Sequence, residues 1–290
     1  MSGRGIGFLL HPREGHGERL GAALEAAERH HYRVWMATDR PETTFAENAA
    51  GCALLVTVGG DGTFLLGARL AAPRGIPVLG VNRGQLGVLT ELEVATLPGA
   101  LDDFAAGRHR VQRRSMLSVR VPGAGAGTPP DLDALALNEV AVKSTGTNLA
   151  RLRVHADDEL LGEYDADGVI IATATGSTAY ALSAGGPPVD PRLRAIVVVP
   201  LAAHAVLTRP IVLPEAVTIH VTVDHGTTTC AADGYVQVPL RQGTRITVCP
   251  GPELQVVHVA GSTTFLHRLR EKMRIGFPLK QSSPDEQGSD

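Results

Sequence analysis

Residues 53–72 read ALLVTVGGDGTFLLGARLAA and predict a strand, a tight turn and a helix in direct succession. The apolar run 53–58 is typical of a buried strand, and residues 63–72 carry apolar side chains near helical spacing. Glycines in the intervening turn permit a sharp change of backbone direction. A buried strand followed at once by a helix is the repeating unit of a parallel sheet, so this stretch indicates an α/β fold.

The first hundred residues repeat this alternation on both sides of the turn. Apolar runs at 5–10, 32–37 and 76–81 predict further strands, and residues 18–30 predict a helix. Strands that are separated by helices form parallel sheets. We therefore expect an α/β domain with a parallel sheet over residues 1–104.

After Phe104 the pattern changes to closely spaced strands with turn signals between them. The predicted strands are 113–121, 134–143, 152–155, 160–163, 217–223, 234–240 and 245–249. Such spacing predicts an all-β (β-rich) C-terminal domain over residues 105–262. Residues 263–278 predict a C-terminal helix that packs back on the body, and the polar residues 279–290 predict a disordered tail. The apolar face of that helix would carry Phe265, Leu266, Leu269 and Met273.

The composition argues against nucleic-acid and membrane partners. Aromatic residues make up 4% of the 290 residues, too few to build a base-stacking platform, and the formal net charge of -3 does not attract a polyanion. The longest apolar stretch, residues 195–207, is interrupted by Pro200 and His204 and could not span a bilayer.

Cysteine usage and the N-terminus both predict a cytoplasmic location. The three cysteines lie far apart and form no CxxC pair, so neither a disulfide framework nor a zinc site is indicated. The N-terminal apolar run, residues 6–10, is too short for a secretory signal.

The glycine turn is a candidate site of chemistry. Gly60 and Gly62 flank Asp61 where the predicted helix begins, and the free amides of a helix N-terminus favour phosphate. A carboxylate there would repel a bare phosphate, so Asp61 makes sense facing a hydroxyl or a metal-bound phosphate. Aspartate is also a common N-cap, and both interpretations stay open. No GxxxxGK[S/T] motif is present, which excludes the Walker-type ATP site.

Two further segments combine small and polar residues. Residues 167–180 read DGVIIATATGSTAY, in which hydroxyl side chains following an apolar strand could bond phosphate or ribose. A helix cap by Ser177 or Thr178 would explain only one of those hydroxyls. Asn138 and Glu139 lie inside a predicted strand and could bond ribose hydroxyls, although neighbouring strand residues face opposite sides of a sheet.

Taken in order, these segments resemble the NAD kinase family. Residues 59–62 match its GGDG turn, 138–139 its Asn-Glu motif, and 175–180 with 182–187 its long Gly/Thr/Ser segment. Residues 80–90 look like its G-x-N-x-G-x-LGFLT stretch, and residues 209–212 and 233–234 look like its later markers. The similarity covers nearly the whole chain.

The resemblance implies a two-domain fold, in which residues 1–104 form a nucleotide-binding domain that carries the GGDG turn and residues 105–262 form an NAD-binding domain. It also implies phosphorylation of the 2'-hydroxyl of the adenosine ribose of NAD, giving NADP. It implies that Asp61 lies at that hydroxyl as the general base or orienting residue. The amides of Gly60 and Gly62 would hold the phosphates of the donor. The implied NAD contacts are Asn138 and Glu139 at the other ribose, Asp167 on the nicotinamide side, and Thr178, Ala179, Tyr180 and Ser183 at the adenosine end.

The resemblance also implies the partners. The donor would be ATP or polyphosphate, accompanied by Mg²⁺ or another divalent cation that the protein itself does not ligate. Members of the family form homodimers or homotetramers.

Three positions depart from the family pattern: Val88 replaces a Phe, Ala174 a Pro and Leu207 a Ser. The last leaves the role of His204 open. Two alternatives follow: a dinucleotide-binding sensor without catalysis, and a lipid or other small-molecule kinase of the same superfamily. The second would share the glycine turn but would not need the Asn-Glu pair.

Overall fold

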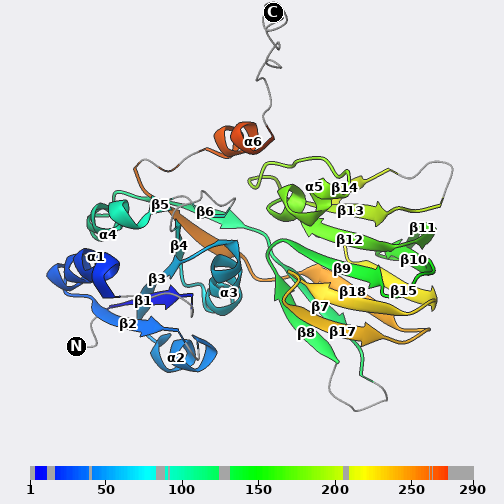
Figure 1. Cartoon of the computed structure of the whole chain (residues 1–290), viewed down its shortest axis with the longest axis horizontal. Coiled ribbons are helices and arrows are strands. Elements are labelled where there is room, and N and C mark those ends of the chain that lie inside the picture. Colours follow the sequence, from blue (N-terminus) through cyan, green and yellow to red (C-terminus); the bar gives the residue numbers. More distant parts are fainter. Residues whose placement is uncertain are drawn as a thin grey trace, which may run out of the picture.

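The computed structural model forms two lobes that lie side by side, with a C-terminal helix above them (Figure 1). It describes residues 4–11, 17–38, 41–82, 89–90, 92–123, 131–204, 209–260, 262 and 264–273. Val88, Leu207, residues 274–278 of the expected helix and the expected tail 279–290 lie outside the described residues. The expected division at Phe104 stays a prediction.

The first lobe is a mostly parallel sheet between helices. Its strand order is β2-β1-β3-β4-β19-β6, with β5 beside β4. The strands are β1 (Gly5–Leu10), β2 (Arg33–Ala37), β3 (Cys52–Val58), β4 (Val78–Asn82), β5 (Leu92–Glu93), β6 (Arg110–Arg114) and β19 (Leu254–His258). All pair in parallel except β6, which runs antiparallel to β19. The parallel sheet expected around the glycine turn is confirmed.

Each face of this sheet is covered by its own helices, as the crossover connections require. The helices are α1 (Gly17–Arg29), α2 (Pro41–Asn48), α3 (Asp61–Ala71) and α4 (Leu97–Ala105). On one face, Leu20 of α1 and Leu101 of α4 share a core with Phe8. On the other face, Phe45 of α2 and Phe64 of α3 share a core with Leu55. The glycine turn therefore belongs to a rigid sandwich of sheet and helices.

The second lobe consists of two antiparallel sheets. One has the order β11-β10-β15-β18-β7-β8 and the other β14-β13-β12-β9-β16-β17. The first contains β7 (Leu117–Val121), β8 (Leu132–Ala136), β10 (Ala150–Ala156), β11 (Glu159–Ala166), β15 (Ile219–His225) and β18 (Arg245–Pro250). The second contains β9 (Glu139–Ser144), β12 (Gly168–Thr173), β13 (Ala195–Leu201), β14 (Ile211–Pro214), β16 (Thr228–Ala232) and β17 (Val236–Leu240). The expected β-rich second half is confirmed.

The core of this lobe lies between the sheets, where Val142 and Ile171 pack with Leu152 and Val221. The outer face of the second sheet carries the short helix α5 (Tyr180–Ser183), whose Ala181 joins a smaller apolar cluster. The Gly/Thr/Ser segment is thereby held against the sheet that also contains the Asn-Glu strand.

The C-terminal helix α6 (Phe265–Met273) meets the body through a face that overlaps the predicted one only in part. Leu266 is 66% exposed, whereas Arg268 is only 8% exposed. Phe265, Arg268 and Leu269 recur at three- and four-residue spacing and share one side of the helix, with Leu266 a quarter-turn away. A guanidinium therefore occupies part of the docking face, where the sequence predicted only apolar groups.

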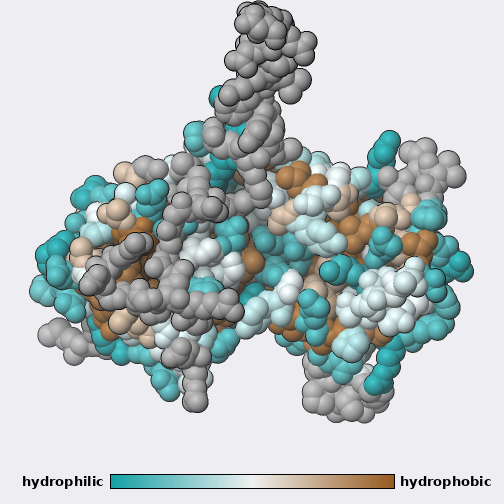
Figure 2. All heavy atoms as spheres, viewed as in Figure 1, coloured by the Kyte–Doolittle hydropathy of each residue, from teal (hydrophilic) through white to brown (hydrophobic). Residues whose placement is uncertain are grey.

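The surface is a mixture of polar and apolar side chains. Among the described residues, no helix is long and apolar enough to cross a membrane. Apolar groups are interrupted by hydrophilic side chains on the face shown in Figure 2.

Candidate functional site

The glycine turn joins β3 to α3 and leaves Asp61 free of a capping role. The N-cap of α3 is Gly60, in extended backbone, with no side-chain cap hydrogen bond. Asp61 follows in the first helical turn, half-buried, and its Oδ1 accepts a hydrogen bond from the Leu89 backbone N–H at 3.1 Å. The N-cap interpretation of Asp61 is therefore wrong: its carboxylate is directed toward the segment after β4.

The glycines of this turn have two different functions. A Cβ on Gly59 would overlap the side chain of Thr63, so packing alone excludes a side chain there. Gly60 and Gly62 are exposed, and a Cβ on either would meet no atom within 4 Å. Their backbone faces open space beside the positive end of α3, which is the arrangement that a bound phosphate group requires.

The Asn-Glu motif and the Gly/Thr/Ser segment pack directly against each other. A Cβ on Gly176 would overlap the backbone of Asn138, so only glycine allows this approach. The Thr173 backbone N–H donates to the Asn138 carbonyl at 2.9 Å, and the Thr173 hydroxyl donates to the Leu137 carbonyl at 2.6 Å. Two segments that are 37 residues apart in the sequence thus form one cradle.

Ser177 fixes the turn that contains Ala174. Its hydroxyl donates to the Ala174 carbonyl at 2.7 Å and accepts from the Val189 backbone N–H at 2.8 Å. These bonds hold the turn at the position where the family pattern has proline.

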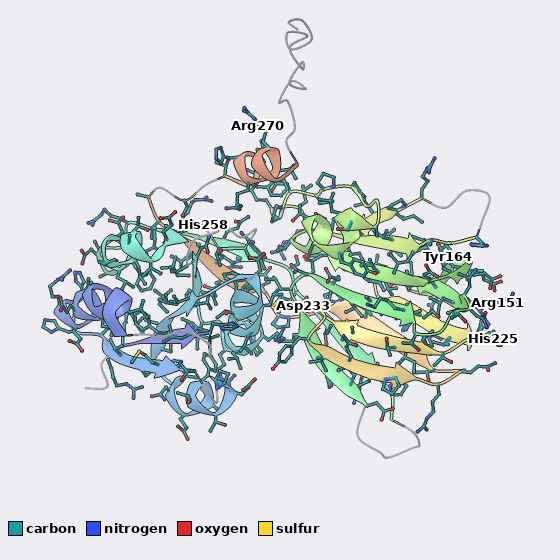
Figure 3. The ribbon with its side chains drawn as sticks, viewed as in Figure 1. Arg151, Tyr164, His225, Asp233, His258 and Arg270 are labelled. Atoms are coloured by element: carbon teal, nitrogen blue, oxygen red, sulfur yellow. The ribbon has the colours of Figure 1, made fainter. Side chains whose placement is uncertain are left out.

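A buried aspartate supports the Asn-Glu strand from behind. The Asp233 side chain is 0% exposed, and its carboxylate accepts backbone N–H bonds from Leu137 (2.9 Å), Asn138 (2.8 Å) and Glu139 (3.2 Å). Burial raises the pKa of Asp233, and these three donors together with Arg69 oppose that rise. Figure 3 places Asp233 where the two lobes meet.

Arg69 of α3 links the glycine-turn helix to this strand. Its Nη1 lies 3.7 Å from the Asp233 carboxylate, and its guanidinium lies over the Tyr235 ring, 4.5 Å from the centroid. The helix that begins at Asp61 is therefore connected to the strand that begins at Glu139 through one buried ion pair.

Glu139 combines burial with an unused oxygen. Its residue is 8% exposed, and burial, reinforced by the charge of Asp233, raises its pKa to about 7; the Tyr180 backbone N–H acts in the opposite direction. Among the described residues, Oε2 has no hydrogen-bond partner. Such an oxygen can accept a hydroxyl hydrogen from a ligand.

A cavity of about 540 Å³ opens beside α5. It is lined by Lys143, Ser144, Gly146, Asp167, Tyr180, Ser183, Ala184, Leu201 and Ala202. Three of the predicted NAD contacts, Asp167, Tyr180 and Ser183, are thereby brought together. Glu139 adjoins them through the Tyr180 N–H. The cavity is within the size range of small-molecule sites.

Other predicted residues lie outside the lining of this cavity. Asp61, Gly60 and Gly62 belong to the first lobe, and Asn138 contributes its backbone to the cradle. Thr178 is buried, with its hydroxyl 3.4 Å from the Thr175 carbonyl, and Ala179 is half-buried.

Sequence reasoning missed Lys143 and Ser144. The Lys143 Nζ lies 5.6 Å from the centroid of the Tyr180 ring. The available signal was the two-residue period of a strand, which puts Lys143 on the same face as Glu139. Within the described ranges, no group of three or more His, Cys, Asp or Glu side chains could hold a metal ion.

Known proteins resemble the chain over both lobes. The family described as ATP-NAD kinase N-terminal domain matches residues 7–109, and ATP-NAD kinase C-terminal domain matches residues 137–259. An NAD kinase of Heliobacterium modesticaldum is 42% identical over 77% of this chain and 79% of the relative. An NAD kinase of Moorella thermoacetica is 40% identical over 77% of this chain and 71% of the relative.

Solved structures agree with the sequence relatives. An NAD kinase from Archaeoglobus fulgidus in complex with ATP has a TM-score of 0.72 at 27% identity, covering 93% of this chain and 98% of that one. The yeast NADH kinase complexed with NADH has a TM-score of 0.81 at 22% identity, covering 97% and 91%, and shares the fold. The chain therefore belongs to the NAD kinase family, the phosphotransferases that convert NAD to NADP.

Proposed function

We propose that this enzyme transfers a phosphoryl group to the 2'-hydroxyl of the adenosine ribose of NAD, with Asp61 orienting that hydroxyl and accepting its proton. The observation that carries the proposal is the position of the Asp61 carboxylate. It stands at the open glycine turn, is held by the Leu89 N–H and is not used as a helix cap.

The step requires positioning more than basicity. The ribose oxygen attacks the terminal phosphorus, the bond from that phosphorus to the bridging oxygen of the donor breaks, and the hydroxyl proton passes to Asp61. Phosphoryl transition states are loose, so a carboxylate at hydrogen-bond distance suffices as base when it holds the oxygen in line.

NAD would bind in the cavity beside α5. Asp167 would contact the nicotinamide side, while Tyr180 and Ser183, with Thr178 and Ala179 behind them, would line the adenosine end. Glu139, through its unpaired Oε2, and Asn138 would hold ribose hydroxyls. The support for these roles is the meeting of three of these residues in one cavity and the direct contact between the two motifs.

The phosphate donor would lie against the amides of Gly60 and Gly62, two residues with open space where a side chain would stand. ATP is the favoured donor because the Archaeoglobus fulgidus relative is described in complex with ATP, and polyphosphate is the second candidate. Mg²⁺ would enter with the donor as part of the substrate and neutralise its charge. A homodimer or homotetramer in the cytoplasm is the expected form.

The test is formation of NADP by the purified protein from NAD with Mg-ATP or with Mg-polyphosphate, read with an NADP-specific dehydrogenase. Because that dehydrogenase distinguishes the 2'-phosphate, a signal also establishes which hydroxyl is modified. We expect product with Mg-ATP. A phosphorylated dinucleotide that the dehydrogenase rejects would contradict the assignment of the 2'-hydroxyl.

A further inference from the structure

The cavity beside α5 contains two opposite charges. Among the described residues that line it, Lys143 is the single cation and Asp167 the single carboxylate. The backbone of Lys143 pairs with that of Gly168 across β9 and β12, and the Ser144 N–H donates to the Asp167 carbonyl at 2.8 Å. The cation and the carboxylate therefore belong to neighbouring strands that meet at the same end of the sheet.

The Lys143 ammonium has no counter-charge of its own. Its Nζ lies 5.6 Å from the centroid of the Tyr180 ring, and among the described residues it forms no hydrogen bond and no ion pair, with Asp167 or with any other carboxylate. Its charge lowers the pKa of Glu139, but burial and Asp233 outweigh that effect. Lys143 is half-buried, and a cation that is partly removed from water favours an anionic partner.

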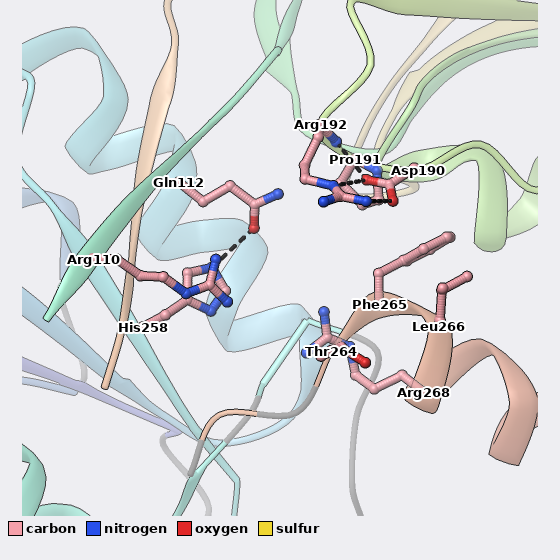
Figure 4. A pocket seen from close by; sticks show the side chains of 10 residues that line it. All are labelled: Arg110, Gln112, Asp190, Pro191, Arg192, His258, Thr264, Phe265, Leu266 and Arg268. Atoms are coloured by element: carbon pink, nitrogen blue, oxygen red, sulfur yellow. Dashed lines mark hydrogen bonds and ion pairs between the residues drawn. The ribbon is translucent and has the colours of Figure 1, made fainter. Parts of the chain in front are cut away.

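Arg192, in another cavity, shows the contrasting arrangement (Figure 4). That cavity has a volume of about 340 Å³ and is lined partly by α6. The Arg192 guanidinium is bound to Asp190 by two hydrogen bonds of 2.9 and 2.7 Å, and this pairing lowers the pKa of Asp190. Arg192 thus has its counter-charge in the fold. An aromatic ring, by contrast, orients an ammonium without neutralising it, so Lys143 can still attract an anion.

We propose that Lys143 binds the pyrophosphate of NAD. This inference rests on the proposed function, in which Tyr180 lines the adenosine end of the cavity and Asp167 the nicotinamide side. Lys143 faces the Tyr180 ring and adjoins Asp167 through the backbone, so it is close to both ends. The pyrophosphate is the anionic group of NAD, and it joins the two nucleosides.

The charges of the cavity also match those of the dinucleotide. The pyrophosphate is anionic and would be attracted by Lys143, whereas the oxidised nicotinamide ring is cationic and would be attracted by Asp167. In NADH the ring is uncharged, so only the attraction by Lys143 would remain. An ammonium binds phosphate oxygens through charge-assisted hydrogen bonds. We therefore expect Lys143 to strengthen the binding of NAD and of NADH by the same factor.

The test is calorimetric titration of the full chain with NAD, NADH and adenosine, without a phosphate donor. Adenosine keeps the base and one ribose but lacks the pyrophosphate. Lys143→Met removes the charge and keeps the length of the side chain, and Lys143→Arg keeps the charge. The control, Arg241→Gln, removes the same charge at an exposed position outside the cavity lining.

We expect Lys143→Met to weaken the binding of NAD and NADH alike by about tenfold or more, and that of adenosine by less than about twofold. Lys143→Arg and the control should stay within about threefold of the wild type for all three ligands. Thermal unfolding checks that each variant is folded, and Lys143→Gln replaces Lys143→Met if the latter is unstable.

An indirect effect through Glu139 is tested separately, because the charge of Lys143 lowers the pKa of Glu139. The titrations are repeated in a Glu139→Gln background, in which position 139 cannot ionise. Lys143→Met should weaken NAD binding by the same factor there. A factor that falls to about one would show that Lys143 acts only through Glu139, and would overturn the proposal.

Three further results would overturn it. Unchanged NAD affinity in Lys143→Met would remove Lys143 from the site, even if the wild type forms NADP. Equal losses for NAD and adenosine would show that Lys143 shapes the cavity rather than binding the pyrophosphate. A gain in affinity for NAD but not for NADH would place the ammonium against the nicotinamide ring. A wild-type chain that binds neither dinucleotide would contradict the proposed function itself, and this inference with it.

Discussion

The glycine turn at residues 59–62 and the cradle formed by Asn138 and Gly176 use glycine for opposite purposes. At Gly60 and Gly62 the missing side chain leaves open space, whereas at Gly176 it lets two backbones touch. The first arrangement provides room for a ligand, and the second provides a fixed frame. Under the proposed function, donor phosphates would enter an open turn, while NAD would meet a preformed surface.

Asp61 in the glycine turn and Glu139 beside the cradle differ in a similar way. Asp61 is half-buried, and its Oδ1 accepts a hydrogen bond from the Leu89 backbone N–H. Glu139 is buried, has its pKa raised to about 7 and rests on a strand fixed by the three hydrogen bonds of Asp233. The two carboxylates thus lie in different lobes, which the Arg69–Asp233 ion pair connects.

The largest expected effect separates the two kinds of glycine. Gly176→Ala should destabilise the fold by about 3 kcal/mol or more, or prevent folding, because the new Cβ would overlap the Asn138 backbone. Gly62→Ala should keep or raise stability, since it lies in the first turn of α3 with open space around it, but should lower kcat/KM. Urea unfolding measures the change in stability, and steady-state turnover measures kcat/KM. Equal losses of stability in the two variants would refute the distinction between Gly176 and Gly62.

The next effect concerns the buried support of the Asn-Glu strand. Asp233→Ala leaves three backbone donors unsatisfied and should cost about 3 kcal/mol. The matched control is Asp157→Ala: Asp157 has a similar positive φ, but its carboxylate accepts a single N–H, from Thr218, at an exposed hairpin. It should cost about 1 kcal/mol or less. Thermal unfolding of both variants measures the difference, and similar losses would count against a supporting role for Asp233.

A smaller effect follows from the ionisation of Glu139. Its pKa in the folded chain is about 7, above the ordinary 4.5, so folding favours the protonated form. This contribution to stability is present below about pH 4.5 and is lost as the pH rises to about 7. Glu139→Gln cannot ionise, so it should gain about 2 kcal/mol relative to the wild type between pH 4.5 and pH 8. Denaturant unfolding of both proteins across that pH range measures the difference between their free energies of unfolding. A difference that does not change with pH would contradict the raised pKa of Glu139.

The smallest expected effect is a change in the KM for NAD with little change in stability. Tyr180 is partly exposed and lines the cavity beside α5, so Tyr180→Ala should raise the KM for NAD by roughly tenfold and shift the unfolding temperature little. Tyr32→Ala, a partly buried tyrosine of the first lobe outside that cavity, is the control for loss of a ring. An unchanged KM in the Tyr180 variant would remove Tyr180 from the NAD site.

Local features of the molecule could be predicted from the sequence. The strand and helix around residues 53–72 follow from periodicity and glycine chemistry over a few residues. The position of Lys143 at the cavity could have been predicted too, because strand alternation puts it on the same face as Glu139.

Long-range pairing could not be predicted. β19 joins the first sheet beside β4, about 175 residues earlier, because its apolar face completes a core that no local pattern defines. Asp233 directly precedes the predicted strand 234–240, yet its carboxylate accepts hydrogen bonds from amides about 95 residues away. The burial of Arg268 could not be predicted either, since helical periodicity alone favours burial of the apolar face.

The most direct test of the account is to measure NAD binding and NADP formation on the same preparation of Asp61→Asn. Asparagine keeps the size and the acceptor for the Leu89 N–H but removes the charge that takes the proton. The account predicts NAD affinity within about threefold of the wild type and turnover lower by roughly a thousandfold or more. Turnover near the wild-type rate would show that Asp61 is not the residue at the reacting hydroxyl.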